Sequence, residues 1–203
     1  GLHNAAGQID QVTVNLKLLD ATVARDKAAA KGFRGGASAY MAGEARWSLR
    51  AAFAEAEKQI ILGTGNDSDG FNGFADSVFV DDVGDGMVVD AGGGQGVGNS
   101  AYLIRSTPDD VALVTNGEIE VGDLEGVRIY DGSSASYPGW QMDILSWLGV
   151  QVGNQFGISR IYGIDSSNPL TDDVVAEAYA KHPRGTQPTH LVVDREAWRL
   201  LQQ

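Results

Sequence analysis

One segment constrains the fold of this chain more than any other. Residues 37–62 are rich in Ala, Glu, Arg, Lys and Leu, which are among the strongest helix formers. Gly63 follows as a suitable helix stop. Such a helix would be about 40 Å long, roughly twice the average for globular proteins. The pattern is compatible with an ordinary long core helix, because the length of a helix alone identifies no function. The apolar positions that predict its buried face are Leu49, Phe53, Ala56 and Ile60.

The chain changes character after this helix and a Gly- and Asp-rich loop. Residues 77–165 are dense in Val, Ile, Tyr, Trp and Gly, which predicts an antiparallel β region with short connections. Turn signals stand at Asn116-Gly117, Asp131-Gly132 and Pro138-Gly139. The first two of these dipeptides predict hairpins. The expected strands are 77–81, 86–90, 100–106, 111–115, 126–130, 141–152 and 156–164.

The segment before the long helix alternates apolar and polar residues, which predicts a half-buried strand within 11–24. A short helix at 25–31 is expected to follow. The residues expected on the apolar face of the strand are Val12, Val14, Leu16 and Leu18.

The last part of the chain predicts a helix, a strand and a second helix. Residues 170–182 carry Thr171 as a good N-cap, and 189–194 are strand-like. Asp194 is a natural N-cap for a helix from residue 195. Because no stop signal precedes Gln203, we expect further elements to complete the fold beyond it. Helices and antiparallel strands together predict the α+β class.

The composition disfavours several classes of function. The chain has 15 basic and 27 acidic residues, a net charge of −12, which disfavours broad nucleic-acid binding and contact with anionic membranes. It has no cysteine, which excludes disulfides and thiolate chemistry. No apolar run is long enough to cross a membrane, and the first residues do not resemble a signal peptide. The chain does not begin with Met, which is compatible with proteolytic processing or with a fragment.

No motif in the sequence predicts an enzyme or a bound cofactor. The Gly-rich stretch 90–102 lacks the Gly-Lys-Ser/Thr of a phosphate loop and leads into a strand-like segment. No Gly-x-Ser-x-Gly is present. The histidines lack metal-type spacing, and paired acids are expected to be solvated surface charges. These residues are His3, His182 and His190, and the pairs Asp81-Asp82, Asp109-Asp110 and Asp172-Asp173.

The loop at 66–76 resembles half of an EF-hand. If Gly70 takes the sixth position, Asp67, Asp69 and Asp76 take the third, fifth and twelfth. The first position would be Gly65, which offers no side-chain ligand. These three acids are therefore weak candidates for a calcium site, and turn formation is the favoured explanation.

Five aromatic residues fall within one strand-rich stretch. They can form a β core, or they can form contacts between subunits, where aromatic residues are enriched. The sequence leaves both explanations open, and we take Tyr137, Trp140 and Trp147 as interface candidates. The full set is Tyr137, Trp140, Trp147, Phe156 and Tyr162.

The order of these segments resembles the tailed-bacteriophage major capsid proteins of the Hong Kong 97-like fold. A strand, VTVNLKLLDATVA, leads through a double glycine to an Ala- and Glu-rich helix ending in EAEKQIILGTGNDSDGFNGF. SAYLIRSTPDDVALVTNGEIEVGDLEGVRIYDG and WQMDILSWLGVQVGNQFGISRIYGID are similar to central stretches of some members. THLVVDREAWRLLQQ resembles a strand–helix unit of their axial lobe. The resemblance covers most of residues 10–203.

The resemblance implies a division of the chain. Residues 1–36 would be the N-terminal arm and the return strand of the extended loop, and 37–63 the spine helix. Residues 64–168 would form the β-rich peripheral and axial region, and 169–203 the helices and strand of the axial lobe.

The resemblance also implies a structural function without catalysis or cofactor. Copies of the chain would self-assemble into hexamers and pentamers of an icosahedral virion head, built in the host cytoplasm around double-stranded DNA. Decoration, portal or scaffold proteins would be further partners. The resemblance implies no binding to a membrane. An encapsulin-like bacterial compartment shell is an alternative with the same fold. A calcium-binding β-rich module is an alternative of another class.

Overall fold

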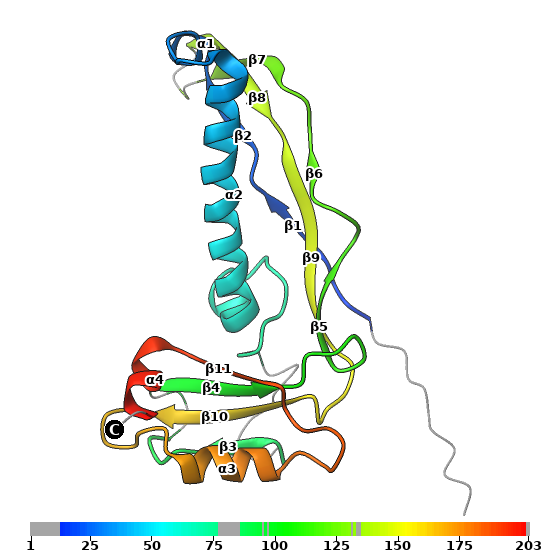
Figure 1. The fold of residues 1–203 in the computed structure, drawn as a ribbon, viewed down its shortest axis with the longest axis vertical. Helices are drawn as coiled ribbons and strands as arrows, with labels where there is room; N and C mark the ends of the chain where they lie inside the picture. The colour runs from blue at the N-terminus through cyan, green and yellow to red at the C-terminus, as the bar shows by residue number, and fades with distance from the viewer. Residues whose placement is uncertain are drawn as a thin grey trace, which may run out of the picture.

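The chain folds into an elongated molecule with two parts, which we call the arm and the lobe (Figure 1). The computed structural model describes residues 13–76, 86–94, 96, 98–130, 132 and 135–201. The arm consists of a long helix beside two antiparallel sheets, and the lobe consists of a third sheet with two C-terminal helices. The architecture is α+β, as the sequence predicts.

The long helix of the arm, α2, spans Gly36–Leu62, which confirms the expected 37–62. It ends at Gly63, whose left-handed φ of 55° suits glycine and whose N–H donates to the carbonyl of Gln59. The expected buried face is confirmed at Ala56 and, as a packed neighbour, at Ile60, but Phe53 is exposed. The fully buried positions are Met41, Ala52, Ala56 and Gln59.

Two sheets run along one side of α2. In the first, β9 lies between β1 on one edge and β5 and β6 on the other; in the second, β8 lies between β2 and β7. The first sheet contains β1 (Lys17–Asp20), β5 (Val111–Thr115), β6 (Glu120–Val121) and β9 (Ile144–Val152). The second contains β2 (Val23–Asp26), β7 (Glu125–Tyr130) and β8 (Ser136–Met142). The short α1 (Lys27–Lys31), capped by Asp26, and a turn link β2 to α2.

Two of the three expected turns are different in the structure. Asn116-Gly117 does not form a hairpin, because β5 and β6 both pair with the same edge of β9 and the dipeptide only interrupts that edge. Pro138-Gly139 lies inside β8, and a side chain at Gly139 would collide with Ile129. The third expectation is confirmed: β7 and β8 form an antiparallel hairpin around Gly132.

The first strand is shorter than expected, and its inward face is not the expected one. β1 begins at Lys17, and Leu19, not Leu18, packs against the core. Leu18 is 48% exposed on the opposite face. Val14 and Leu16 are half-buried, as the alternation predicts. The alternation fails at Leu18 because Leu19 is the residue that packs against the cluster containing Ala52 of α2.

The lobe contains a four-stranded sheet in the order β11-β4-β10-β3, in which only β3 and β10 are parallel. Its helices begin as expected: the hydroxyl of Thr171 caps α3, and the carboxylate of Asp194 accepts from the N–H of Ala197. No helix in the described part of the chain is long and apolar enough to cross a membrane. The bounds are β3 (Val88–Asp90), β4 (Asn99–Ile104), β10 (Ile158–Ile164), β11 (His190–Val193), α3 (Asp172–Ala180) and α4 (Arg195–Leu201).

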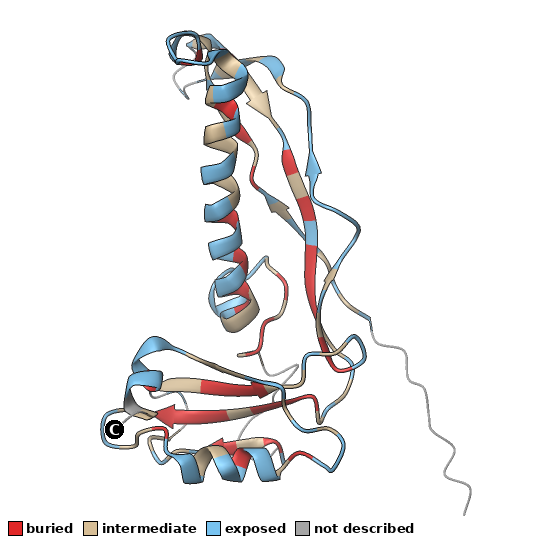
Figure 2. Ribbon diagram, in the orientation of Figure 1, coloured by how far each residue is buried: buried red, intermediate tan, exposed pale blue. Residues whose placement is uncertain are grey.

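The two larger clusters of buried residues lie in the lobe and at its junction with the arm (Figure 2). One cluster lies within the lobe, a second joins the lower end of α2 to β4, β5, β9 and β10, and a small third cluster lies in the arm. Residues 64–168, expected as one β-rich region, contribute strands to all three sheets. The expected strand 77–81, the pair Asp81-Asp82, and the residues Val12 and His3 lie outside the described residues.

Candidate assembly surface

The helix α2 is covered by its own chain on one stripe only. Four of its 27 residues are buried, and large apolar side chains stand in solvent on its other sides. Trp47 is 68% exposed, with the guanidinium of Arg50 5.3 Å from its ring centroid, and Phe53 is 47% exposed. Exposed aromatic side chains of this kind are typical of contacts with other proteins. The side of α2 that faces away from the sheets is therefore a candidate contact surface.

The sheet that contains β9 also exposes an apolar pair. Leu18 and Trp147 are directly opposite one another on β1 and β9, and each is nearly half exposed. Inward-facing β9 residues, such as Leu148, are buried, so the outward face lacks a cover from the chain itself. Trp147, an interface candidate from the sequence, therefore lies on the surface of the molecule.

The other two interface candidates lie on β8. Tyr137 is 38% exposed, whereas Trp140 is half-buried and carries the ammonium group of Lys27 4.1 Å from its ring centroid. This cation–π contact links the start of α1 to β8. Of the remaining aromatic residues, Tyr162 is buried in the lobe and Phe156 is half-buried. The five aromatics therefore do not form one group: they are divided between surface and core.

The loop after α2 uses its polar side chains to hold its own backbone. The carboxylate of Asp76 accepts hydrogen bonds from the N–H groups of Thr64 and Gly73, at 3.0 and 2.8 Å, and from the hydroxyl of Thr64. Partial burial acts to raise the pKa of Asp76, but these hydrogen bonds hold it below its usual value. The amide of Gln59 donates to the carbonyls of Asp67 and Phe71. The loop is thereby fixed against the end of α2.

The carboxylates of the three weak calcium candidates do not converge on one site. Asp76 points into the loop backbone, whereas Asp67 accepts from the N–H of Asp69 at 2.9 Å in a local turn. Within the described residues no three acidic or histidine side chains come together as a metal site. The observed contacts of these acids are those of turn formation.

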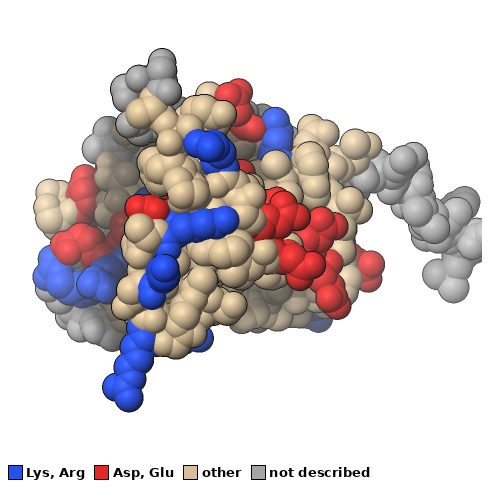
Figure 3. Space-filling view, turned by 90° about the horizontal axis from the view of Figure 1, so that it is seen from above, with Lys and Arg blue, Asp and Glu red and all other residues tan. Residues whose placement is uncertain are grey.

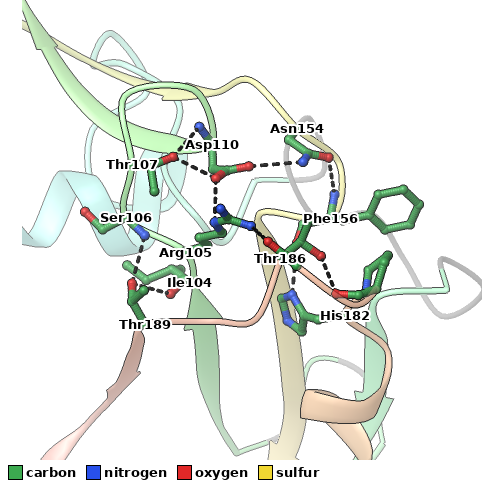
Figure 4. A network of polar contacts seen from close by, with 12 residues as sticks. Ile104, Arg105, Ser106, Thr107, Asp110, Asn154, Phe156, His182, Thr186 and Thr189 are labelled. Atoms are coloured by element: carbon green, nitrogen blue, oxygen red, sulfur yellow. Dashed lines mark hydrogen bonds and ion pairs between the residues drawn. The ribbon is translucent and has the colours of Figure 1, made fainter. Parts of the chain in front are cut away.

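The arm and the lobe are joined by a polar network around Asp110 (Figure 4). Its carboxylate lies 2.9 Å from the Nε of Arg105 and accepts from the Thr107 hydroxyl at 2.7 Å and the Asn154 amide at 3.0 Å. Arg105 also donates to the carbonyl of Gly185. Two of the chain segments that pass between arm and lobe, 105–110 and 153–157, are thereby tied together. Asp110 was expected as solvated charge, but it is only 6% exposed because it closes this crossing.

His182 extends the same network. One ring nitrogen lies 2.9 Å from the carbonyl oxygen of Phe156 (Figure 4). The other lies 3.0 Å from the hydroxyl of Ser159, which fixes the end of α3 on β10. Burial lowers the pKa of His182, against the opposing effect of the hydrogen bond to Phe156. His190 is exposed on β11, and its Nδ1 lies 2.8 Å from the hydroxyl of Thr189. Neither histidine lies in a metal-type cluster among the described residues.

Comparison with known proteins gives a structural neighbour. No protein-family model and no curated protein sequence matches the chain. A chain of the bacteriophage Epsilon15 structure, determined by cryo-electron microscopy and modelling, has a similar fold with a TM-score of 0.52 and 14% sequence identity. The similarity covers 90% of this chain and 62% of the phage chain, so the present chain spans about three fifths of its neighbour. The chain thus shares the fold of a bacteriophage protein.

Proposed function

We propose that this chain is the structural subunit of a bacteriophage capsid, a major capsid protein that assembles with copies of itself. The observation that carries the proposal is the fold shared with a chain of bacteriophage Epsilon15 over 90% of the present sequence. That likeness agrees with the resemblance of the sequence segments to tailed-phage capsid proteins.

The shape of the molecule supports this function physically. A helix that buries four of its 27 residues in its own chain gains little from intramolecular packing on its other sides. Neighbouring copies would cover the exposed aromatics of α2 and the apolar pair on β1 and β9. An elongated subunit makes such contacts with several neighbours, so the interface area is distributed over the shell.

The finer proposal is a head of hexamers and pentamers that encloses double-stranded DNA. A subunit with a net charge of −12 presents a mostly repulsive wall to phosphate, which permits DNA to be enclosed without adhesion. Residues 1–36 would then act as the N-terminal arm and the return strand of the extended loop of such a subunit, and 169–203 as the helices and strand of its axial lobe. Decoration, portal and scaffold proteins are further partners that this proposal allows.

Electron microscopy of the purified full-length protein tests the proposal. We expect rings of five or six copies, or closed shells tens of nanometres across, at high protein concentration. Shells that contain DNA after production with a packaging system would support the phage head. Shells that contain protein cargo and no DNA would instead support the encapsulin-like compartment.

A monomer that remains compact and single at high concentration would contradict every version of the shell proposal. Micromolar calcium binding by such a monomer, lost on Asp67→Ala, would establish the calcium-binding module in its place. The described contacts of Asp67 and Asp76 are satisfied within the loop and do not favour that outcome.

A further inference from the structure

The arm carries two exposed charged regions of opposite sign. Residues 25–50 contain six basic and two acidic residues, a net charge of +4, although the chain as a whole carries −12. Residues 118–125 contain four acidic residues and no basic one. We call the first group the basic patch and the second the acidic edge. The exposed basic patch residues that form no ion pair are Lys31, Arg34, Arg46 and Arg50, and the acidic edge residues are Glu118, Glu120, Asp123 and Glu125.

The two regions lie on different sides of the same length of the arm. The helix α2 packs on β1, β2, β8 and β9, whereas β6 and β7 occupy the opposite edges of the two sheets. Ile144, which pairs with Val121 of β6, packs in one cluster with Ala52 of α2, so β6 lies level with the middle of the helix. Viewed along the arm, Lys and Arg side chains in the centre and Asp and Glu side chains to their right form separate groups (Figure 3).

These eight charged side chains lack an ion-pair partner within the described part of their own chain. The ion pairs of the arm are Arg25 with Glu44 and Lys58 with Glu55. Arg25 belongs to residues 25–50, but the other exposed charged residues of the two regions form no ion pair within the described residues. Each region also contains a large exposed apolar side chain: Trp47 beside Arg46 and Arg50, and Val121, 63% exposed, between Glu120 and Asp123. An apolar centre with a charged rim is the usual anatomy of a protein interface.

We infer that the basic patch of one copy contacts the acidic edge of a second copy, with the two arms side by side. This inference rests on the proposed assembly function and names the surface that makes the contact. Outside residues 25–50 the chain has 9 basic and 25 acidic residues, a net charge of −16, so most surfaces of two copies repel one another. The basic patch is the region where the acidic surface of another copy is attracted.

The geometry also defines the symmetry of the contact. Two different patches on opposite sides of one subunit give a heterologous contact, which closes into a ring or continues as a filament. Opposite charges in register steer such encounters and reject the like-charged pairing of basic patch with basic patch. The two ends of the pairing therefore specify the neighbour and its orientation.

Charge reversal of each region separately tests the contact. Glu118→Lys with Glu120→Lys reverses the acidic edge, and Arg34→Glu with Arg46→Glu reverses the basic patch, all at exposed positions. Sedimentation velocity at about 0.15 M salt, where charges interact over roughly 8 Å, measures the protein concentration at which rings or shells form. We expect each double variant to raise that concentration at least about tenfold.

The decisive experiment combines the two charge reversals in one chain. All four substitutions in one chain restore complementarity, and we expect assembly to return to within about threefold of the wild-type concentration. A mixture of the two double variants restores only alternating contacts, so it should form rings with an even number of copies. Asp173→Lys with Glu177→Lys, at exposed positions of α3 in the lobe, changes the net charge by the same amount, and we expect assembly to be unaffected.

Several outcomes would overturn the inference. Double variants that assemble like the wild type, or a four-substitution variant that does no better than either double variant, would show that other surfaces make the contact. Circular dichroism checks whether the lysine variants fold. If one folds poorly, Glu118→Gln with Glu120→Gln replaces it, and this milder change should raise the assembly concentration by a smaller factor. DNA binding that Arg34→Glu with Arg46→Glu abolishes, without a change in assembly, would assign the basic patch to nucleic acid. A wild-type protein that never assembles would contradict the proposed function itself, and the inference with it.

Discussion

The arm and the lobe bury their residues in different ways. In the lobe, β10 is buried at six of seven positions because strands flank it on both sides and α3 packs on it. In the arm, α2 is buried at four of 27 positions, and the cluster beneath it contains only three buried residues, Ala21, Ala52 and Ile144. The lobe is therefore completed by its own chain, whereas the arm leaves most of its helix surface for other contacts.

This difference shows where folding and assembly are divided in the sequence. Buried side chains in the lobe stabilise the monomer, so changes there are expected to appear in its free energy of unfolding. Exposed side chains on the arm contribute little to the monomer, so changes there are expected to appear in association. The network at Asp110 lies between the two parts and holds one against the other.

The largest effect is expected in the lobe. Ile161 of β10 is fully buried, and Ile161→Ala should lower the free energy of unfolding by about 3 kcal/mol because it leaves a cavity in the sheet. Chemical denaturation followed by circular dichroism measures the change. Phe53→Ala, on the exposed side of α2, is the matched control and should change the free energy by less than about 0.5 kcal/mol. Equal losses in both variants would contradict the division between lobe and arm.

A smaller effect is expected at the junction. Asp110→Asn removes the charge that faces Arg105 and should cost about 2 kcal/mol, less than a fully buried pair, because Arg105 is partly exposed. Denaturant unfolding gives the free energy, and small-angle X-ray scattering checks whether the arm keeps its orientation. Glu196→Gln, which breaks the exposed pair with Arg199, should have no measurable effect on unfolding. An Asp110→Asn protein as stable as the wild type would show that the network does not lock the junction.

The third effect depends on pH. Because burial holds the pKa of His182 below its usual 6.5, the unfolded chain takes up the proton more readily than the folded one. This contribution to stability is complete above pH 6.5 and is lost as the pH falls through the window below it. Thermal unfolding between pH 7.5 and 5.5, on the order of the range over which His titrates, should show a decrease that His182→Gln reduces. An unchanged pH dependence in the variant would assign it to other groups.

The smallest effect on the stability of the monomer is expected at Trp47, on the exposed side of α2. Its side chain is 68% exposed, so Trp47→Ala should change the free energy of unfolding by less than about 0.5 kcal/mol. The same variant should weaken assembly severalfold, because a large aromatic side chain at an interface contributes strongly to binding. Sedimentation velocity distinguishes the two effects. Assembly at the wild-type concentration would place Trp47 outside the contact.

Much of the arm and lobe could be predicted from local patterns. The composition of residues 37–62 indicates α2 almost to the residue, and Thr171 and Asp194 mark the starts of α3 and α4 as N-caps. The junction could not be predicted in this way. Asp110 and His182 are buried by partners 44 and 26 residues distant, Asn154 and Phe156, and no local pattern signals such partners. Asp110 was wrongly expected at the surface for that reason.

The type and extent of the helices, most of the strands, the net charge and the lack of cysteine can all be read from the amino-acid sequence. Those properties follow from the residues themselves or from neighbours within a turn or two along the chain. The covered face of each element and the order of the strands follow from the folded chain instead: Leu19 packs inward, Phe53 lies in solvent, and β5 and β6 share one edge of β9. Burial depends on contacts between segments distant in the sequence, and periodicity indicates that a covered face exists without specifying which elements cover it.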